Sequence, residues 1–272
     1  MIPRADVTAW RAIARWPSDA QVEQDLVSSR ALVALFADPT VARSMAFRGG
    51  TALHKLFLER PGRYSEDIDL VQVDPGAIGP ALGAIRSTMD PWLGQPKWAQ
   101  GHGRVTLVYR FETTSRPVQQ MRLKLEVNTR EHFTVLGLTR RDFGVRTRWF
   151  TGEAGVTTYQ IEELLGTKLR ALYQRRKGRD LFDLWLALTS VPVDEDKVVE
   201  CFSGYLAHDG ATISRAELEA NLSGKLEAPA FLADLHPLLP AKTLYDPHQA
   251  AGVVRGRLLA RLPGAPWKGA GA

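Results

Sequence analysis

The sequence predicts an α+β protein, in which a small mixed sheet flanked by helices is followed by an α-helical lobe. Two segments, residues 104–111 and 121–127, alternate apolar and polar side chains, as half-buried strands do. Beyond residue 156 the apolar residues instead recur at helical spacing, and several segments open with capping residues. We therefore place the boundary near Gly155, with a mixed domain over residues 1–155 and a helical lobe over residues 156–272.

Composition sets the broad class of the protein. Its 272 residues can bury a large core, and 44% hydrophobic with 24% charged residues is ordinary for a globular protein. The net charge of +5 is compatible with polyanionic partners such as nucleotides or nucleic acid. The single cysteine, Cys201, excludes an internal disulfide. We find no apolar run of membrane-spanning length and no signal-peptide core, so we expect a cytoplasmic protein without a membrane segment.

Helix-start and helix-stop residues divide the first domain. We expect a short helix over residues 10–16, ended by Pro17, and a long helix opened by a capping box of Ser18 and Gln21. A strand over residues 45–47, a helix from Thr51, a strand over residues 67–71 and a helix over residues 75–89 then follow. In the lobe we expect helices from residues 157 and 180, and further helices capped by Asp194, Ser214 and Asp246.

The stretch from residue 47 to residue 71, FRGGTALHKLFLERPGRYSEDIDLV, contains the strongest functional pattern. In a strand, Asp67 and Asp69 point to one side, while Ile68 and Leu70 point to the other. Two carboxylates so close repel each other unless a cation lies between them, and Mg²⁺ is commonly held by one or two carboxylates plus substrate phosphates. An exposed strand face is the simpler interpretation of the pair taken alone.

The glycine pair Gly49-Gly50 precedes a predicted helix. Glycine lets backbone approach a ligand closely, and the free N–H groups of a helix start favour an anion. A glycine pair by itself more often marks only a turn. A phosphate-binding helix start followed by a carboxylate pair suits metal-assisted phosphoryl or nucleotidyl transfer.

These residues resemble a known family. Gly49-Gly50-Thr51 followed by Ser65-Glu66-Asp67-Ile68-Asp69-Leu70 is similar to the first signature of the polymerase-β-like nucleotidyltransferases, and most of all to the AbiEii/AbiGii toxins of type IV toxin–antitoxin systems. Lys168 and the segment 179–184, RDLFDL, extend the resemblance. Thr51 stands where the superfamily usually has Ser, and the gap between Gly50 and Asp67 is longer than in the compact form of the superfamily's first motif.

The resemblance implies a toxin that transfers a nucleoside monophosphate from an NTP to an acceptor and releases pyrophosphate. It implies two Mg²⁺ ions, a separately encoded antitoxin, and growth inhibition or abortion of phage infection. Because some relatives act on the 3′ end of tRNA, we expect tRNA as the acceptor. Nucleotidylation of a protein or a small molecule, and a non-catalytic nucleotide-binding module, stay open as alternatives. The sequence does not select the NTP.

The resemblance also assigns roles to residues. Asp67 and Asp69 are expected to be catalytic and, with Glu126 on a neighbouring strand, to bind metal; Asn128 and Glu131 are weaker candidates to take the place of Glu126. The expected nucleotide-binding residues are Arg48, Gly49, Gly50, Thr51, Ser65 and Lys168. From spacing alone, Glu126 and Lys124 equally suit a solvated strand face on which they pair with each other.

In the lobe, Lys168 is expected to bind the triphosphate, and Asp180 to position the attacking group or to act as base. Asp183 and Arg179 would support them, as Lys124 would in the first domain. Asp180 and Asp183 also suit simple helix capping, because they lie near a predicted helix start.

Two further features are open to interpretation. His54 and Lys55 are expected on the outer surface of the helix that follows the glycine pair, although Lys55 could instead reach a phosphate. The segment 139–150 is basic and interleaved with aromatic residues, which suits either single-stranded nucleic acid or an exposed edge strand guarded by arginines: Arg140, Arg141, Phe143, Arg146, Arg148, Trp149 and Phe150.

Overall fold

A computed structural model describes residues 2–241 and 243–269. The chain forms two compact units, and it passes from the first to the second after Tyr159. Only Val135–Gly137 depart from this order, because they belong with the second unit. Each unit is described below by itself.

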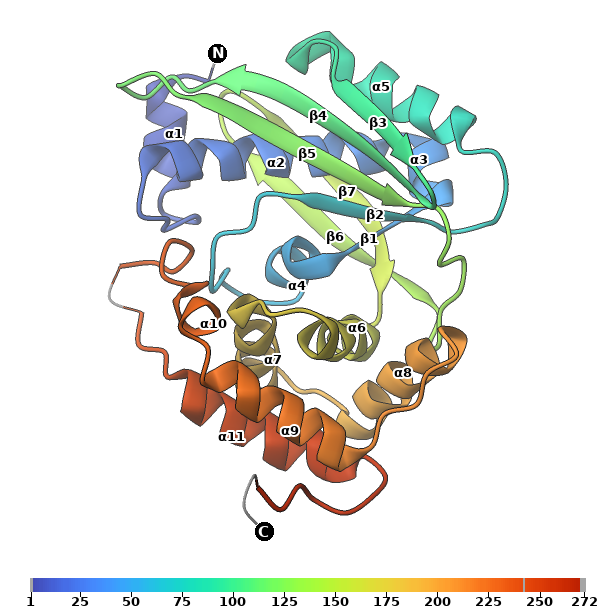
Figure 1. The fold of residues 1–272 in the computed structure, drawn as a ribbon. Helices are drawn as coiled ribbons and strands as arrows, with labels where there is room; N and C mark the ends of the chain where they lie inside the picture. Colours follow the sequence, from blue (N-terminus) through green and yellow to red (C-terminus); the bar gives the residue numbers. More distant parts are fainter. Residues whose placement is uncertain (1, 242, 270–272) are drawn as a thin grey trace. The chain divides into compact units, whose positions relative to one another are not determined.

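A mixed sheet of seven strands organises the first unit, in the order β3-β4-β5-β2-β1-β7-β6 (Figure 1). Strand β2 lies antiparallel to β1 and parallel to β5, and β1 lies parallel to β7. The sheet and the helices of both units confirm the predicted α+β class. The strands are β1 (Met45–Arg48), β2 (Ile68–Gln72), β3 (Lys97–Gly101), β4 (Arg104–Glu112), β5 (Gln120–Asn128), β6 (Leu138–Arg146) and β7 (Thr151–Tyr159).

Helix α2 (Asp19–Ala37) is the longest helix of the first unit and packs against β5, β6 and β7. Its predicted capping box is present, since the Gln21 N–H donates to Ser18 Oγ at 3.2 Å and the Ser18 N–H donates to Gln21 Oε1 at 3.2 Å. The unit also contains α1 (Arg4–Trp10), α3 (Pro39–Ser44), α4 (Gly49–Leu56) and α5 (Gly79–Leu93).

Three helix predictions are wrong in position. Trp10 ends α1 instead of beginning a helix, because Val7 and Trp10 already form the buried side of the preceding turns. Residues 75–78 lie before α5, and Pro91 is accommodated inside that helix. Thr158, expected in a helix, lies in β7 and donates its hydroxyl to the Phe47 carbonyl at 2.6 Å; β-branched residues favour this extended conformation.

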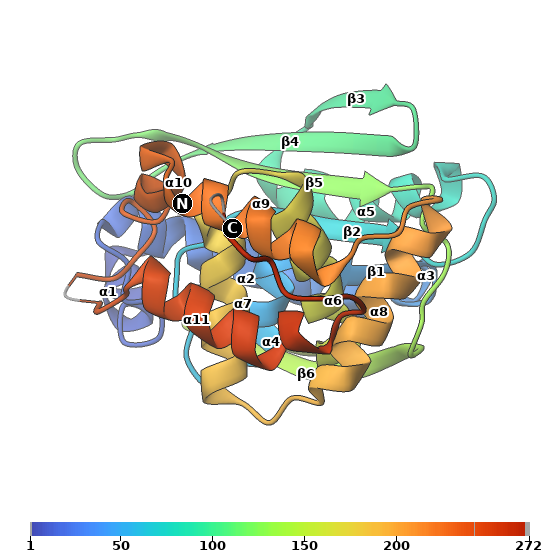
Figure 2. The ribbon, with the colours of Figure 1, turned by 60° about the horizontal axis from the view of Figure 1, so that its bottom comes forward.

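The second unit is helical, as predicted. Figure 2 shows α7, α9 and α11 of this unit, and α11 packs against both α7 and α9. The predicted capping residues Asp194, Ser214 and Asp246 each accept backbone N–H groups at a helix start. The helices are α6 (Ile161–Gln174), α7 (Gly178–Ser190), α8 (Glu195–His208), α9 (Arg215–Leu226), α10 (Pro229–Ala233) and α11 (Pro247–Arg257), with a 3₁₀ turn at Leu259–Arg261.

Glu163 explains why Val135–Gly137 belong to this unit. Its buried carboxylate accepts the N–H groups of Val135 at 2.8 Å and Leu136 at 2.9 Å, and the hydroxyl of Tyr205 at 2.9 Å. A buried carboxylate requires such partners, so the three residues are fixed to α6. Across the described part of the chain, no helix has both the length and the apolar character required to cross a membrane.

Candidate active site

A row of polar residues crosses the centre of the sheet. Strand register aligns Asp69 with Arg48 of β1 on one side and with Glu126 of β5 on the other. Asp67 precedes β2 by one residue, while Ile68 and Leu70, each 1% exposed, face the core. The structure thus brings the three carboxylates of Asp67, Asp69 and Glu126 to the same face of neighbouring strands.

The start of α4 lies directly beside this row. The helix begins at Gly49, two residues before the predicted start at Thr51. Gly49 has φ +83°, and a Cβ at this position would lie 2.5 Å from Asp69 Oδ2. Both the backbone conformation and the close approach therefore require glycine. The first N–H groups of a helix have no partner within it, so this end can bind an anion.

Thr51 and Ser65 connect the helix to the aspartates. The Thr51 hydroxyl, in a residue only 2% exposed, donates to the Asp67 carbonyl at 2.6 Å and lies 2.7 Å from Ser65 Oγ. These contacts hold the backbone of Asp67 against α4. The direct binding of nucleotide by Thr51 and Ser65 stays a prediction.

Lys124 lies among the three carboxylates. Its Nζ is 2.5 Å from Glu126 Oε2, and Arg104 Nη1 is 3.2 Å from Glu126 Oε1. Burial alone would lower the pKa of Lys124, but its hydrogen bond to Glu126 and the charges of Asp67, Glu126 and Asp69 outweigh that effect and raise it. Burial would likewise raise the pKa of Glu126, but Lys124 and Arg104 hold it below its usual value.

This electrostatic arrangement bears on whether a divalent metal fits. The charges of Asp67, Asp69 and Glu126 all act on the ammonium of Lys124, and carboxylate oxygen is the ligand that Mg²⁺ prefers. Within residues 2–241 and 243–269, no three His, Cys, Asp or Glu side chains are gathered closely enough to form a ready metal site. The described side chains alone therefore form no closed metal site, and the binding of Mg²⁺ by these carboxylates together with substrate phosphates stays a prediction.

Arg48 is held by Glu131, a pairing that the sequence did not predict. Its guanidinium pairs with Glu131, whose backbone N–H donates to Asn128 Oδ1 at 3.0 Å. Burial would lower the pKa of Arg48, but Glu131 and, more weakly, Tyr159 and Asp69 raise it. Glu131 was considered only as a substitute for Glu126, and no local signal links it to Arg48, which lies 83 residues earlier.

His54 and Lys55 are not on the outer surface of α4, so both predictions are wrong. His54 is 2% exposed and accepts the Gly62 N–H at Nδ1, 3.1 Å away. Lys55 Nζ donates to Asp25 at 3.1 Å and to Ser29 at 2.8 Å. The loop after α4 contacts His54 and helix α2 contacts Lys55, so both side chains have structural partners inside the unit.

In the second unit, Lys168 lies between two carboxylates that are fully buried. Its Nζ is 3.2 Å from Asp180 and 2.8 Å from Asp183. Asp180 also accepts two hydrogen bonds from Arg175, at 2.6 and 2.8 Å. Burial would raise the pKa of Asp180, but Lys168 and Arg175 lower it. These are the contacts of a carboxylate that orients cations; its predicted role as base stays a prediction.

The remaining candidate residues have structural partners. Arg179, predicted to support Lys168, pairs with Asp234 at 3.2 Å. The basic segment 139–150 begins in β6, which is an edge strand of the sheet. There Arg141 stacks over the Phe57 ring at 4.8 Å, and Arg140 donates to the Gly155 carbonyl at 3.2 Å. An edge strand was one of the two interpretations, and nucleic-acid binding by this segment stays a prediction.

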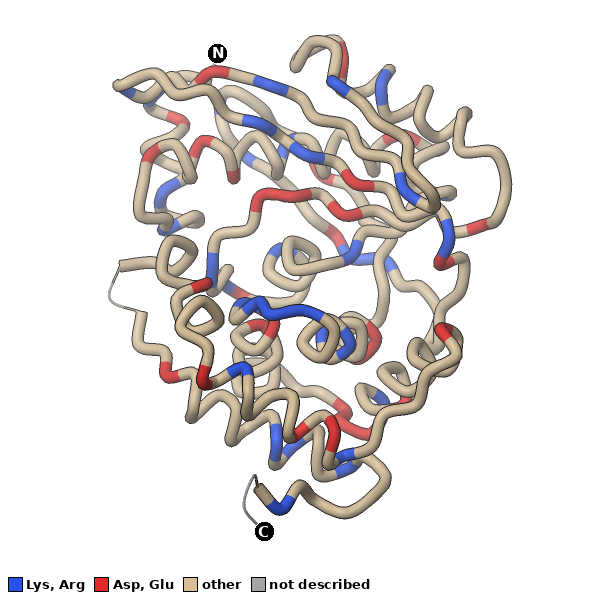
Figure 3. Tube along the Cα trace, viewed as in Figure 1, with Lys and Arg blue, Asp and Glu red and all other residues tan. Residues whose placement is uncertain are grey.

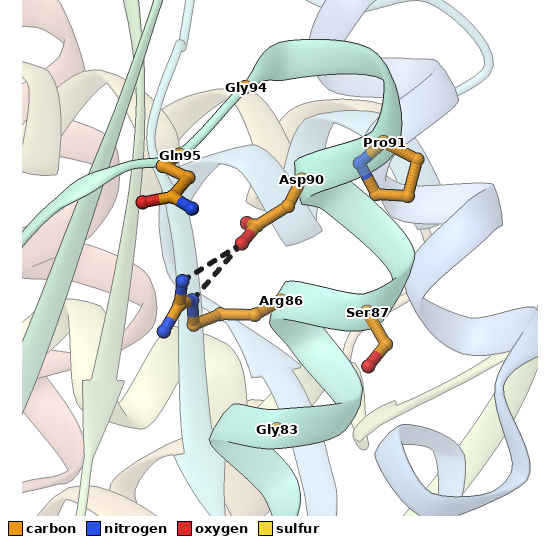
Figure 4. Close-up of a pocket in the computed structure, with 7 residues that line it drawn as sticks. All are labelled: Gly83, Arg86, Ser87, Asp90, Pro91, Gly94 and Gln95. Carbon is orange, nitrogen blue, oxygen red and sulfur yellow. Dashed lines mark hydrogen bonds and ion pairs between the residues drawn. The ribbon is translucent and has the colours of Figure 1, made fainter.

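The hollow beside α5 is a separate feature (Figure 4). Its lining includes Arg86 and Asp90, which pair at 3.1 Å. Asp90 also accepts the hydroxyl of Tyr109 at 2.8 Å, and Tyr109 alternates along β4 with the residues that share the face of Glu126. The hollow therefore lies on the opposite face of the sheet from the carboxylate row.

Comparison with known proteins decides the family. The family model described as "Nucleotidyl transferase AbiEii toxin, Type IV TA system" matches residues 30–252. The chain belongs to the AbiEii nucleotidyltransferase toxin family. The resemblance of the glycine pair and the SEDIDL segment is thereby confirmed, and the chain is a nucleotidyltransferase of a toxin family that uses an NTP and is paired with a separate antitoxin.

Solved structures support the fold of this family member. MenT4, a nucleotidyltransferase toxin from Mycobacterium tuberculosis H37Rv, superposes with a TM-score of 0.68 at 19% identity, over 97% of this chain and 91% of MenT4. JHP933 from Helicobacter pylori gives a TM-score of 0.52 at 19% identity, over 88% of this chain and 90% of its own. No curated protein matches the chain.

Proposed function

We propose that this toxin transfers a nucleoside monophosphate from an NTP to the 3′ end of tRNA, with Mg²⁺ held by Asp67, Asp69 and Glu126. One observation carries the proposal: these three carboxylates lie around the charge of Lys124 and beside the open start of α4. A carboxylate cluster next to a phosphate-binding helix start is suited to a nucleotide–metal complex.

The roles of the chain's own residues follow from their positions. The backbone N–H groups at Gly49, Gly50 and Thr51 would hold the phosphates, and Arg48, oriented by Glu131, adds positive charge on the β1 side of the row. Lys124 pairs with Glu126 in this structure; if Glu126 bound a metal ion instead, the Lys124 ammonium would be able to contact a phosphate oxygen. In the second unit, the binding of the triphosphate by Lys168 stays a prediction of the sequence.

The reaction is an in-line displacement at the α-phosphorus. The acceptor hydroxyl oxygen forms the new O–P bond while the bond between the α-phosphorus and the bridging oxygen breaks. Pyrophosphate leaves with the electron pair, and the hydroxyl proton passes to water. Bound Mg²⁺ would neutralise the charge that develops on the phosphoryl oxygens. Modified 3′ ends would block growth or abort phage infection until the antitoxin acts.

A labelling assay tests the proposal. The full chain is incubated with each α-³²P-labelled NTP, Mg²⁺ and total tRNA, in parallel with Asp69→Asn. Asp142→Asn, an exposed carboxylate on β6, is the matched control. We expect label in tRNA with wild type and control, and a loss on the order of 10²-fold or more with Asp69→Asn or with EDTA, since a ligand of a catalytic metal contributes several kcal/mol.

The alternatives predict different outcomes. Label found in protein or in a small molecule would replace tRNA as the acceptor and leave the nucleotidyl transfer intact. Tight NTP binding without pyrophosphate release, for every acceptor tested, would reduce the chain to a nucleotide-binding module. Full activity of Asp69→Asn would remove the carboxylate row from the mechanism.

A further inference from the structure

An unusual pair of arginines lies on the same face of the sheet as the catalytic carboxylates. In the antiparallel register of β4 and β5, Arg110 stands directly opposite Arg122. Both side chains are exposed, and neither has a carboxylate partner in the part of the chain that the structure describes. Like charges directly opposite each other destabilise an antiparallel pair, so this arrangement favours an anion from outside the chain.

The arginine pair continues into a basic track toward the site. Two residues along each strand, Lys124 faces Val108, which in turn faces Lys97 of β3. Two residues further along, Glu126 faces Thr106 and aligns with Asp69. Figure 3 shows the basic positions of β5 followed along the strand by an acidic one, with the acidic approach to β2 beside it. Four residues at ~3.4 Å each separate the arginine pair from the carboxylate row by about 14 Å.

Strand order puts the two substrates on opposite sides of the row. The start of α4, which follows β1, lies on one side of β2, whereas β5 and β4 lie on the other. In-line displacement requires the incoming hydroxyl and the departing pyrophosphate on opposite sides of the phosphorus. A triphosphate at α4 therefore leaves the β4–β5 side for the acceptor.

We propose that Arg110 and Arg122 bind the sugar–phosphate backbone of the acceptor RNA and lead its 3′ end across the sheet to the carboxylates. This inference rests on the proposed function, because it names the binding surface of the same acceptor. Single-stranded nucleic acid is commonly bound by a positive surface that follows its backbone. At ~3.4 Å per stacked nucleotide, the track holds about four nucleotides between the arginine pair and the reacting end.

The first test measures RNA binding without transfer. A fluorescent single-stranded RNA with a free 3′ hydroxyl is titrated at several NaCl concentrations, with wild type, with Arg110→Gln/Arg122→Gln and with the matched control Arg4→Gln/Arg15→Gln, two exposed arginines of the same unit. Each lost phosphate contact reduces the salt slope by ~0.7, so we expect the track variant to lose about 1.4 and the control to keep the wild-type slope. An equal slope in all three, or a loss confined to the control, would overturn the proposal.

The second test uses acceptor length. With tRNA as acceptor, the KM for tRNA of the track variant should rise several-fold, while its KM for NTP stays at the wild-type value and its melting temperature does not fall. With a dinucleotide acceptor, which is too short to reach the arginine pair, wild type and variant should transfer equally. A variant that is equally impaired on both acceptors would contradict the track.

The two proposals fail separately. If the salt slope falls as expected but no label enters RNA, the arginine pair binds RNA, whereas RNA as the acceptor, and with it the leading of a 3′ end to the carboxylates, is wrong. If label enters tRNA at the wild-type rate and KM in the track variant, the proposed function stands and the track is wrong.

Discussion

Replacement of Lys168 by methionine measures how much the ion cluster of Lys168, Asp180 and Asp183 contributes to the free energy of unfolding. The ammonium lies 2.8 Å from Asp183 and 3.2 Å from Asp180, and both carboxylates are fully buried. Removal of the ammonium takes away a cation that both buried carboxylates contact, and breaking a buried ion pair in this way costs about 3–5 kcal/mol of the free energy of unfolding. Methionine retains most of the volume, so the cost is electrostatic. For a chain of this size the melting temperature should fall by roughly 6–20 °C.

The assay is urea denaturation followed by circular dichroism at pH 7 and pH 5. Asp180 has a lowered pKa in the fold, so its stabilisation is present above the usual carboxyl pKa and is lost only as the pH falls through the lower folded value. In the variant, a carboxylate that has lost the ammonium takes up a proton more readily, so the loss of stability should be smaller at pH 5 than at pH 7. Lys197→Met breaks an exposed pair with Asp194 on α8 and should change stability by less than about 0.5 kcal/mol. Equal stabilities of the two variants at pH 7 would refute the reasoning.

Three further outcomes are expected. Gly49→Ala forces an alanine into φ +83° with its Cβ 2.5 Å from Asp69 Oδ2, so transfer in the labelling assay should fall at least tenfold, whereas an unchanged rate would show that the helix start can move. Glu163→Gln loses a carboxylate that accepts three hydrogen bonds, one from Tyr205, and should lower the free energy of unfolding by about 2–4 kcal/mol in urea titration. Burial lowers the pKa of Lys225 to about 8, so the unfolded chain binds the extra proton between pH 8 and the usual value; stability should therefore rise with pH in that window, and Lys225→Met should abolish the rise.

Local patterns were enough for much of the fold. The capping box of Ser18 and Gln21 and the alternation in β4 and β5 are carried by neighbouring residues, so the sequence predicted these elements correctly. The prediction of a helix from residue 157 is wrong because it used local residues alone. Threonine is common both at helix starts and in strands, so Thr157 and Thr158 fit either element. The strand forms because β7 pairs with β1 and β6, and no local sequence pattern shows this pairing.

The sequence predicted the arrangement of those site residues that lie close together in the chain, but not of those that come from distant segments. Asp67 and Asp69 share a short segment, so their common orientation followed from strand geometry alone. The burial of Lys55 depends on Asp25, 30 residues away on a helix that buries several polar side chains. The alignment of Glu126 with Asp69 depends on register across β2 and β5, and a shift of one residue would have turned Glu126 to the other face.

The contacts of Thr51 explain how the chain tolerates a long gap between Gly50 and Asp67. Its hydroxyl donates to the Asp67 carbonyl and contacts Ser65, so both ends of the intervening segment are fixed to the first turn of α4. The aspartates are positioned by this connection and by the pairing of β2 with β1, and neither depends on the length of the loop between them. Extra residues in that loop cost little, because closure entropy grows only slowly with length. Threonine in place of the usual serine keeps the hydroxyl that forms the connection, so neither the threonine nor the long gap separates the start of α4 from the carboxylate row.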